Sequence, residues 1–255
     1  MTAPAIELRG LGHAFGAGAT PALLRADLEV PRGSFVSIVG PSGCGKTTIL
    51  RILAGLITPT EGEAFVGGVS AIGRPGLVAY MPQKDALLPW RRALDNATLG
   101  AEVRGVSRKL AREQARALFP RFGLTGFERA WPVQLSGGMR QRLALLRTFL
   151  TPGDVLLLDE PFGALDAITR REMHTWLQEV WAADQRTVLF ITHDVEEALV
   201  LSETVYVMTP RPGQIAARVD VPFARPRPPT LVTEPTLVAL KAHLLAALDS
   251  AVRGA

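Results

Sequence analysis

A glycine-rich octet follows an apolar stretch of this chain. Residues 40–47 read G-P-S-G-C-G-K-T, directly after the apolar residues 35–39. Glycine lets consecutive backbone N–H groups turn inward toward an anion, a conformation that side chains obstruct. A buried strand that delivers such a loop into a helix forms a cage for nucleotide phosphates. A chance glycine turn is the alternative, but the full eight-residue pattern favours phosphate binding.

Two side chains in this loop have a chemistry of their own. Lys46 can reach the terminal phosphates of a nucleotide, and the Thr47 hydroxyl can ligate Mg²⁺. The predicted nucleotide-binding residues of the loop are Gly40, Pro41, Ser42, Gly43, Cys44, Gly45, Lys46, Thr47 and Thr48.

Two adjacent carboxylates end a second apolar run. Residues 155–158 read V-L-L-L and are followed by Asp159 and Glu160. Because side chains alternate along a strand, the two carboxylates need not point at the same target. We expect Asp159 to hold Mg²⁺ beside the phosphates, and Glu160 to polarise a water aligned with the terminal phosphate. A charged turn after a core strand is the alternative, and the upstream phosphate loop makes it the weaker one.

A third motif, L-S-G-G-M-R-Q, occupies residues 135–141. Ser136, Gly137 and Gly138 precede a helix whose apolar stripe is Met139, Leu143, Leu146 and Leu150. The free N–H groups and the positive dipole end at such a helix start favour a second anion site. Alone, this pattern is typical of an ordinary helix cap, so the prediction depends on the other two motifs.

The elements that must position these motifs alternate between strands and helices. A helix is predicted over about 46–55, with Gly55 as its C-terminal stop. Residues 84–150 are mainly helical in pattern, which indicates a helical insertion into an α/β core. Strands are predicted at 6–8, 28–30, 35–39, 64–66, 77–81, 155–158 and 188–192, and a further helix at about 167–183.

The C-terminal part reads as a connector and a helix. Residues 222–229 are rich in proline, which favours an extended segment. Beyond it, apolar residues recur at helical spacing: Leu237, Leu240, Leu244, Leu245, Leu248 and Val252. This stripe is predicted to pack on the domain, and a partner contact is the alternative. We therefore divide the chain into residues 1–222 and 223–255.

Composition restricts the class of protein. The 255 residues carry a net charge of +4, but the arginines are scattered and no nucleic-acid-binding motif is present, so we expect no nucleic-acid partner. Apolar runs such as 155–158 are far shorter than the roughly 18 residues of a membrane helix. Residues 1–8 lack the pattern of a signal peptide, which favours a cytosolic location. Cys44 is the one cysteine, which excludes an intrachain disulfide.

Together the motifs resemble the ATP-binding-cassette (ABC) ATPase family over nearly the whole chain. The phosphate loop, the LSGGM signature, the pair Asp159 and Glu160, and the segment P-F-G-A-L-D at 161–166 occur in the family's order. The resemblance implies an α/β fold: a P-loop NTPase (RecA-like) core with an antiparallel β subdomain and an inserted α-helical subdomain. It also implies ATP and Mg²⁺ as ligands, and ATP hydrolysis as the reaction.

The resemblance assigns further residues. The family's glutamine switch falls on Gln83, its switch histidine on His193, its signalling aspartate on Asp166 and its adenine-stacking aromatic on Phe15. The predicted catalytic set is then Lys46, Gln83, Glu160 and His193, and the predicted metal set is Thr47, Gln83 and Asp159. A strand-end histidine and a core aromatic are the alternatives for His193 and Phe15.

The resemblance also implies partners. Head-to-tail homodimers of this family sandwich two ATP molecules, so Ser136, Gly137 and Gly138 of one subunit would close over the nucleotide of the other. A stand-alone ATPase of this kind resembles the motor of a bacterial importer, peripheral at the cytoplasmic face of the inner membrane, with two permease subunits and a solute-binding protein. Leu88 and Trp90, if exposed, are candidates for docking a permease helix, and core burial of Trp90 is the alternative.

The PFGALD segment, the L-L-P-W run at 87–90 and the P-R-P-G run at 210–213 resemble the importer branch for nitrate, sulfonates, taurine and pyrimidine precursors. The stretch Leu146-Arg147-Thr148 replaces an Ala-Arg-Ala-type run of the family, which points within the branch toward pyrimidine precursors or aromatic compounds. A soluble ATPase of iron–sulfur cluster assembly is the alternative function.

Overall fold

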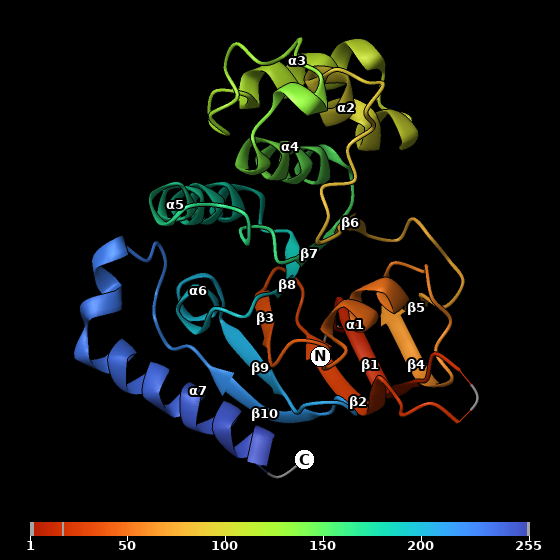
Figure 1. Ribbon diagram of the computed structural model, residues 1–255, viewed down its shortest axis with the longest axis vertical. Helices are drawn as coiled ribbons and strands as arrows, with labels where there is room; N and C mark the ends of the chain where they lie inside the picture. The colour runs from red at the N-terminus through yellow and green to blue at the C-terminus, as the bar shows by residue number, and fades with distance from the viewer. Residues whose placement is uncertain (1–2, 17, 254–255) are drawn as a thin grey trace.

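The chain folds into two β-sheets with a group of helices on one side (Figure 1). The computed structural model describes residues 3–16 and 18–253. The strands are β1 Ile6–His13, β2 Leu23–Val30, β3 Phe35–Val39, β4 Glu61–Val66, β5 Val69–Ser70, β6 Ala79–Met81, β7 Val155–Asp159, β8 Thr187–Ile191, β9 Thr204–Met208 and β10 Ile215–Asp220. The helices are α1 Lys46–Leu53, α2 Ala93–Val103, α3 Arg108–Leu118, α4 Gly137–Leu150, α5 Ala167–Asp184, α6 Val195–Leu201 and α7 Pro235–Arg253, with short 3₁₀ helices at Pro132–Gln134 and Pro229–Thr233.

The larger sheet has the strand order β10-β9-β3-β8-β7-β6, and all its pairs are parallel except β10 with β9. Every residue of β3, β7 and β8 is buried, which explains why these strands read as continuous apolar runs. The two faces pack against different partners. Leu156 and Phe190 belong to the cluster that contains α4 and α5, whereas Leu157 and Leu189 belong to the cluster that contains α1.

The smaller sheet is antiparallel, with the order β2-β1-β4-β5, as the resemblance implied. Its first two strands extend over eight residues each, much further than the predicted 6–8 and 28–30. The β1–β2 register shifts between Leu8 and Leu11, where Gly10 has a φ of 55°. Such a bulge breaks the alternation of buried and exposed residues, so the sequence pattern stops short of the strand end.

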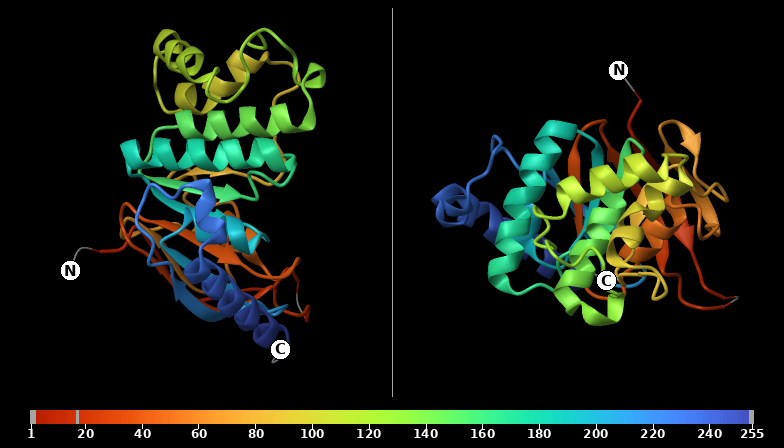
Figure 2. Two further views of the ribbon diagram at one scale, coloured as in Figure 1. Left: turned by 90° about the vertical axis from the view of Figure 1, so that its left-hand side faces the viewer. Right: turned by 90° about the horizontal axis from the view of Figure 1, so that it is seen from above.

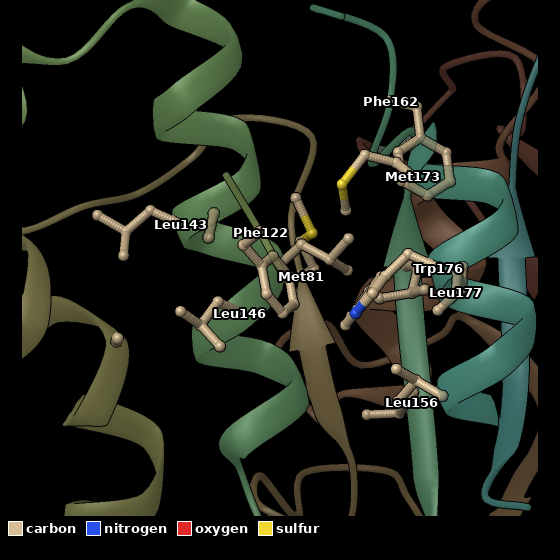
Figure 3. Close-up of a cluster of buried hydrophobic side chains, with 14 of the residues drawn as sticks. Met81, Phe122, Leu143, Leu146, Leu156, Phe162, Met173, Trp176 and Leu177 are labelled. Carbon is tan, nitrogen blue, oxygen red and sulfur yellow. The ribbon is translucent and has the colours of Figure 1, made fainter. Parts of the chain in front are cut away.

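Helices α2, α3 and α4 lie between β6 and β7 in the sequence and form the layer above the larger sheet, as the predicted insertion requires. Figure 2 shows α4 and α5 as two stacked helices between that sheet and the helices α2 and α3. Aromatic side chains join these layers: the ring centroids of Phe122 and Trp176 are 4.1 Å apart (Figure 3). The exact boundaries at residues 84, 150 and 222 stay predictions.

Helix α1, which follows the phosphate loop, ends as a glycine stop predicts. The helix finishes at Leu53 rather than Gly55, and Gly55 adopts a φ of 73° just beyond it. The N–H of Gly55 donates to the carbonyl of Ile52 at 2.9 Å, and the N–H of Leu56 donates to that of Arg51 at 2.9 Å. This pair of bonds is a Schellman motif, which requires a left-handed residue and therefore favours glycine.

The C-terminal helix α7 packs on the domain through one face. Leu237, Leu244 and Ala251 are buried beside residues of α6, β9 and β10, as predicted for the first two. The prediction is wrong for Leu245 and Val252, which are 45% and 52% exposed because they lie one residue off the buried face.

Helix α7 is also long and apolar enough to cross a membrane by length and composition, a property that the sequence pattern did not indicate. Only 17% of its apolar window is buried. Its inner face contacts the domain, and the Lys241 ammonium lies 2.9 Å from a Glu196 carboxylate oxygen. These contacts favour a helix packed on the domain over a membrane span.

Candidate active site

The predicted catalytic residues follow neighbouring parallel strands. The phosphate loop follows β3, Gln83 follows β6, Glu160 follows β7 and His193 follows β8. These strands lie in the order β3-β8-β7-β6, so their carboxyl ends share one edge of the sheet. Ligands of open parallel sheets bind outside this edge. The sheet therefore gathers motifs that are more than a hundred residues apart in the sequence.

The Lys46 side chain bonds the backbone of its own phosphate loop. Lys46 is buried, and its ammonium donates to the carbonyl oxygens of Gly40 at 2.8 Å and Pro41 at 2.9 Å. Gly45, which precedes α1, has a φ of 103°, and a Cβ there would lie 2.6 Å from Leu23 Cδ2. The tight approach of β2 to this position permits no side chain. The loop thus brings the N-terminus of α1 and one buried cation to the same place, which suits an anion.

Asp159 and Thr47 form the predicted metal position. The Thr47 hydroxyl donates to Asp159 Oδ1 at 3.2 Å, while Asp159 Oδ2 is buried and has no hydrogen-bond partner. Burial raises the pKa of the Asp159 carboxyl, the Thr47 hydrogen bond opposes that rise, and the Glu160 charge adds to it. An unpaired buried carboxylate oxygen fits a hard cation such as Mg²⁺.

No group of three or more His, Cys, Asp or Glu that could hold a metal occurs within residues 3–16 and 18–253. A cation here would be held by Asp159 and the Thr47 hydroxyl, with oxygens of the substrate and of water completing its shell, which is the usual arrangement for Mg²⁺ at nucleotide phosphates.

Glu160 lies between the two predicted switch residues. The Gln83 amide donates to Glu160 Oε2 at 3.2 Å, and His193 Nδ1 lies 3.4 Å from the same oxygen. The backbone of Glu160 has a φ of 49°, a strained conformation for a residue with a side chain. The Glu160 N–H donates to the carbonyl of Ile191 at 3.0 Å, and the Gln141 amide donates to the Glu160 carbonyl at 3.3 Å. These contacts fix the direction of the carboxylate.

A cavity of about 370 Å³ runs along these groups. Phe15 forms part of its wall and is 60% exposed, so Phe15 is not a core aromatic. The ring of His13 packs against the Phe15 ring edge to face, with the centroids 4.6 Å apart. The residues that line the cavity are Phe15, Ala22, Ser42, Gly43, Gly45, Lys46, Thr47, Thr48, Gln83, Glu160 and Arg211.

The signature motif and Asp166 lie outside this cavity lining. Ser136 caps α4, and its hydroxyl accepts the N–H of Met139 at 3.2 Å. Asp166 caps α5, and its hydrogen bonds from the backbone and the hydroxyl of Thr169 lower its pKa. A Cβ on Gly138 would lie 3.2 Å from Leu165, so the start of α4 packs near the PFGALD segment. One chain thus joins the phosphate loop to Gln83, Glu160 and His193, but not to its own signature.

Three residues lie at the site in positions that the sequence motifs did not predict. Arg211 reaches the cavity from the loop after β9, and Gln141 bonds the backbone of Glu160 from α4. Burial, together with the charge of Asp159, raises the pKa of Tyr80 to about 12. The P-R-P-G run was the one available signal for Arg211, but it pointed to a branch of the family and not to a place in the fold.

The sequence profile of the ABC transporter family matches residues 23–163, which span β2 to the loop beyond Glu160. The chain belongs to the ABC transporter family. The aliphatic sulfonates import ATP-binding protein SsuB 1 of Rhodococcus jostii is 49% identical over 222 residues, or 87% of this chain and 85% of that protein. The taurine import ATP-binding protein TauB of Rhizobium johnstonii is 44% identical over 205 residues, or 80% of this chain and 78% of that protein.

A solved structure supports membership of the same family. The dimeric structure of a post-hydrolysis state of the ATP-binding cassette MJ0796, bound to ADP and Pi, has a TM-score of 0.76 and 27% identity to this ABC ATPase. The match covers 86% of this chain and 100% of that chain. The predicted fold class, the ATPase activity and the resemblance to sulfonate and taurine import proteins are confirmed. The individual roles of Gln83, Glu160 and His193 stay predictions.

Proposed function

We propose that this ABC ATPase is the motor subunit of an importer for small sulfonates, of the aliphatic sulfonate or taurine type. The observation that carries the proposal is the 49% identity to an aliphatic sulfonates import protein over most of both chains. The relatives favour sulfonates over the pyrimidine precursors that the Leu146-Arg147-Thr148 stretch suggested. They also disfavour iron–sulfur cluster assembly, since both are named for import.

We assign each side chain at the site a role in ATP hydrolysis from its position. Lys46 and the loop N–H groups bind the terminal phosphates, where they stabilise charge that develops during cleavage. Glu160 orients and polarises the attacking water, and the contacts of Gln83 and His193 with Glu160 Oε2 hold that carboxylate in place. Mg²⁺, held by Thr47 and Asp159, would supply further charge neutralisation on the phosphate oxygens.

The position of the signature supports a homodimer. Since Ser136, Gly137 and Gly138 do not line the cavity of their own chain, a second chain is the proposed source of these groups. Gly137 has open space around it, with only an Arg140 nitrogen near an added Cβ, at 3.9 Å. A helix start that is exposed in this way can approach the phosphates of another subunit.

A groove beside the site is the proposed contact for the permease subunits. A cavity of about 500 Å³ lies between the sheet edge and the helical layer, lined in part by Leu56, Tyr80, Leu99 and Arg147. Trp90, which is 71% exposed and so not a core residue, lies in the segment that follows Gln83.

This segment is tied to the signature helix. Arg147 of α4 donates to the carbonyls of Asp85 at 2.7 Å and Ala86 at 2.8 Å, and Arg140 donates to the Asp85 carboxylate at 3.0 Å. A change at Gln83 would therefore move the proposed docking surface together with α4. In this proposal the protein works at the cytoplasmic face of the inner membrane, with two permease subunits and a solute-binding protein.

Loss of the gene tests the proposed transport. A strain without it is expected to lose growth on taurine or an alkanesulfonate as the sulfur source while it still grows on sulfate. The wild-type gene should restore growth, and the Glu160→Gln gene should not. The protein should also follow the membrane fraction when permeases are present. Normal growth on sulfonates, with the protein bound to a soluble iron–sulfur scaffold, would contradict the proposal.

A further inference from the structure

The loop between β9 and β10 contains the P-R-P-G run and is closed by its own hydrogen bonds. The Thr209 N–H donates to the Gln214 carbonyl at 3.0 Å, and the Gln214 N–H donates to the Thr209 hydroxyl at 2.9 Å. The same hydroxyl donates to the Pro212 carbonyl at 3.1 Å. These bonds fix the backbone on both sides of Arg211, so the position of the Arg211 side chain is well defined.

This loop binds the backbone that precedes β2. Arg211 Nε donates to the carbonyl of Pro21 at 3.1 Å, and its Nη2 donates to the carbonyl of Thr20. The Gly213 N–H donates to the carbonyl of Ala22 at 3.1 Å, and the Leu24 N–H returns a bond to Gly213 at 3.0 Å. Four bonds therefore hold residues 20–24, which lead from the Phe15 region into β2.

The same loop touches the phosphate loop. A Cβ on Gly213 would lie 1.9 Å from the Cys44 carbonyl oxygen, so only glycine fits between the two loops. On the other side, the Ala22 carbonyl would lie 2.8 Å from a Cβ on Gly45. The Ala22 N–H donates to the carbonyl of His13 at 2.7 Å, and the His13 ring supports Phe15. A path of contacts thus runs from the phosphate loop through Gly213, Ala22 and His13 to Phe15. Arg211 binds the backbone of the two residues that come just before Ala22.

Phe15 and Arg211 both line the cavity that contains Lys46 and Thr47. A planar guanidinium can donate to two consecutive carbonyls at once, which a lysine ammonium cannot do with the same geometry. The two carbonyls that Arg211 binds belong to the segment that carries the aromatic wall of the cavity.

We propose that Arg211 is a positioning residue for the nucleoside half of ATP. It ties residues 20–21 to the loop that packs on the phosphate loop, and so holds Phe15 at the distance from Lys46 that a bound nucleotide requires. This proposal rests on the proposed nucleotide site, with adenine against Phe15. It assigns the P-R-P-G run to substrate affinity, and not to contact with the permease or the solute.

The test separates the nucleoside from the phosphates. Purified Arg211→Met protein is titrated by calorimetry with Mg-ADP and, separately, with Mg-pyrophosphate, neither of which the enzyme hydrolyses as an ATPase. We expect the Kd for ADP to rise about tenfold, the order of magnitude of one base–aromatic stacking contact, and the Kd for pyrophosphate to stay within about twofold. In ATPase assays the KM for ATP should rise similarly while kcat at saturating ATP stays unchanged.

Three further variants make the result specific. Arg211→Lys keeps the charge but loses the planar guanidinium that donates to two carbonyls at once. Its Kd for ADP should therefore stay close to that of Arg211→Met. In a Phe15→Ala background, Arg211→Met should add no further loss, because the ring that it positions is gone. Arg218→Met is the matched control, since Arg218 is an exposed arginine on β10 that pairs with Asp220.

Different failures have different meanings. Equal losses for ADP and pyrophosphate, full rescue by lysine, or additive losses with Phe15→Ala would each overturn the positioning role of Arg211. If the wild-type protein bound pyrophosphate but not ADP or ATP, the proposed nucleotide site itself would fail. A melting temperature of Arg211→Met equal to that of Arg218→Met establishes that the losses do not come from unfolding.

Discussion

At the scale of single residues, the centre of the proposed chemistry is one carboxylate with an unusual backbone. Glu160 has a φ of 49°, and its side chain contacts Gln83 and His193. Strain of this kind persists only where surrounding contacts hold it, and it concentrates at functional sites. The backbone bonds to Ile191 and Gln141 provide that support.

The first prediction concerns this carboxylate. Glu160→Gln keeps the shape and the contact with Gln83 but removes the charge that polarises water. We expect ATP turnover to fall by about 10²- to 10⁴-fold, the usual contribution of a general base, while ATP binding is retained. Phosphate release and nucleotide titration measure the two effects. Glu172→Gln, at an exposed position on α5, is the control, and near-normal turnover of Glu160→Gln would remove Glu160 from this role.

The residues of this site differ in how far the sequence could predict them. Lys46, Asp159 and Glu160 lie in motifs that indicate their chemistry. Lys46 and Glu160 line the cavity, and Asp159 lies behind it, bonded to Thr47. Gln83 and His193 came from the family order, and both lie against Glu160. The P-R-P-G run could not place Arg211 in the site, because the partners of Arg211 are backbone carbonyls of Thr20 and Pro21, far away in the sequence.

At the scale of elements, uninterrupted apolar runs were the most predictable feature. β3 was predicted with its observed bounds because both of its faces are buried. β9 was not predicted although all of its residues are buried, and β10 was not predicted either. β10 is an edge strand with Val219 as its one buried residue, and it pairs with β9 alone. α6 has only seven residues, too few for a helical period to stand out. Edges and short elements depend on tertiary contacts that no local pattern contains.

Two glycines at helix ends provide a test at this scale. Gly55 after α1 and Gly105 after α2 have φ values of 73° and 85°, and each forms the same pair of backbone bonds to its helix. A Cβ on Gly55 would lie 2.5 Å from the Arg74 carbonyl carbon, whereas a Cβ on Gly105 would meet nothing within 4 Å.

Alanine at the two positions should therefore have different costs. Gly105→Ala should lower the free energy of unfolding by about 1–2 kcal/mol, the cost of the left-handed conformation alone. Gly55→Ala should cost more, because the 74–75 backbone must also move to remove the overlap. Urea denaturation of both variants measures the difference. Equal losses would show that the contact with Arg74 is relieved without cost.

At the scale of the whole molecule, the single chain is incomplete for the proposed reaction. Its cavity contains the phosphate loop, Gln83 and Glu160, but its lining includes none of Ser136, Gly137 and Gly138. A solved cassette of the same fold is dimeric in its ADP-bound and Pi-bound state. Both observations favour a site that two chains share, with a phosphate loop from one and a signature from the other.

Complementation between two inactive variants tests this sharing. Lys46→Ala removes the phosphate-binding cation but leaves the signature intact. Gly137→Glu places a negative charge in the signature, and the open space around Gly137 lets the chain fold normally. Each variant alone should lack ATPase activity. In a mixed dimer, the intact phosphate loop of the Gly137→Glu chain meets the intact signature of the Lys46→Ala chain.

An equal mixture of the two should regain about a quarter of the wild-type activity. Half of the dimers are mixed, and each mixed dimer has one intact site of two. A single chain that carries both substitutions is the control: mixed with wild type, its mixed dimers contain no intact site, because each site includes either the altered loop or the altered signature. If each chain used its own signature, the mixture of single variants would stay as inactive as its components.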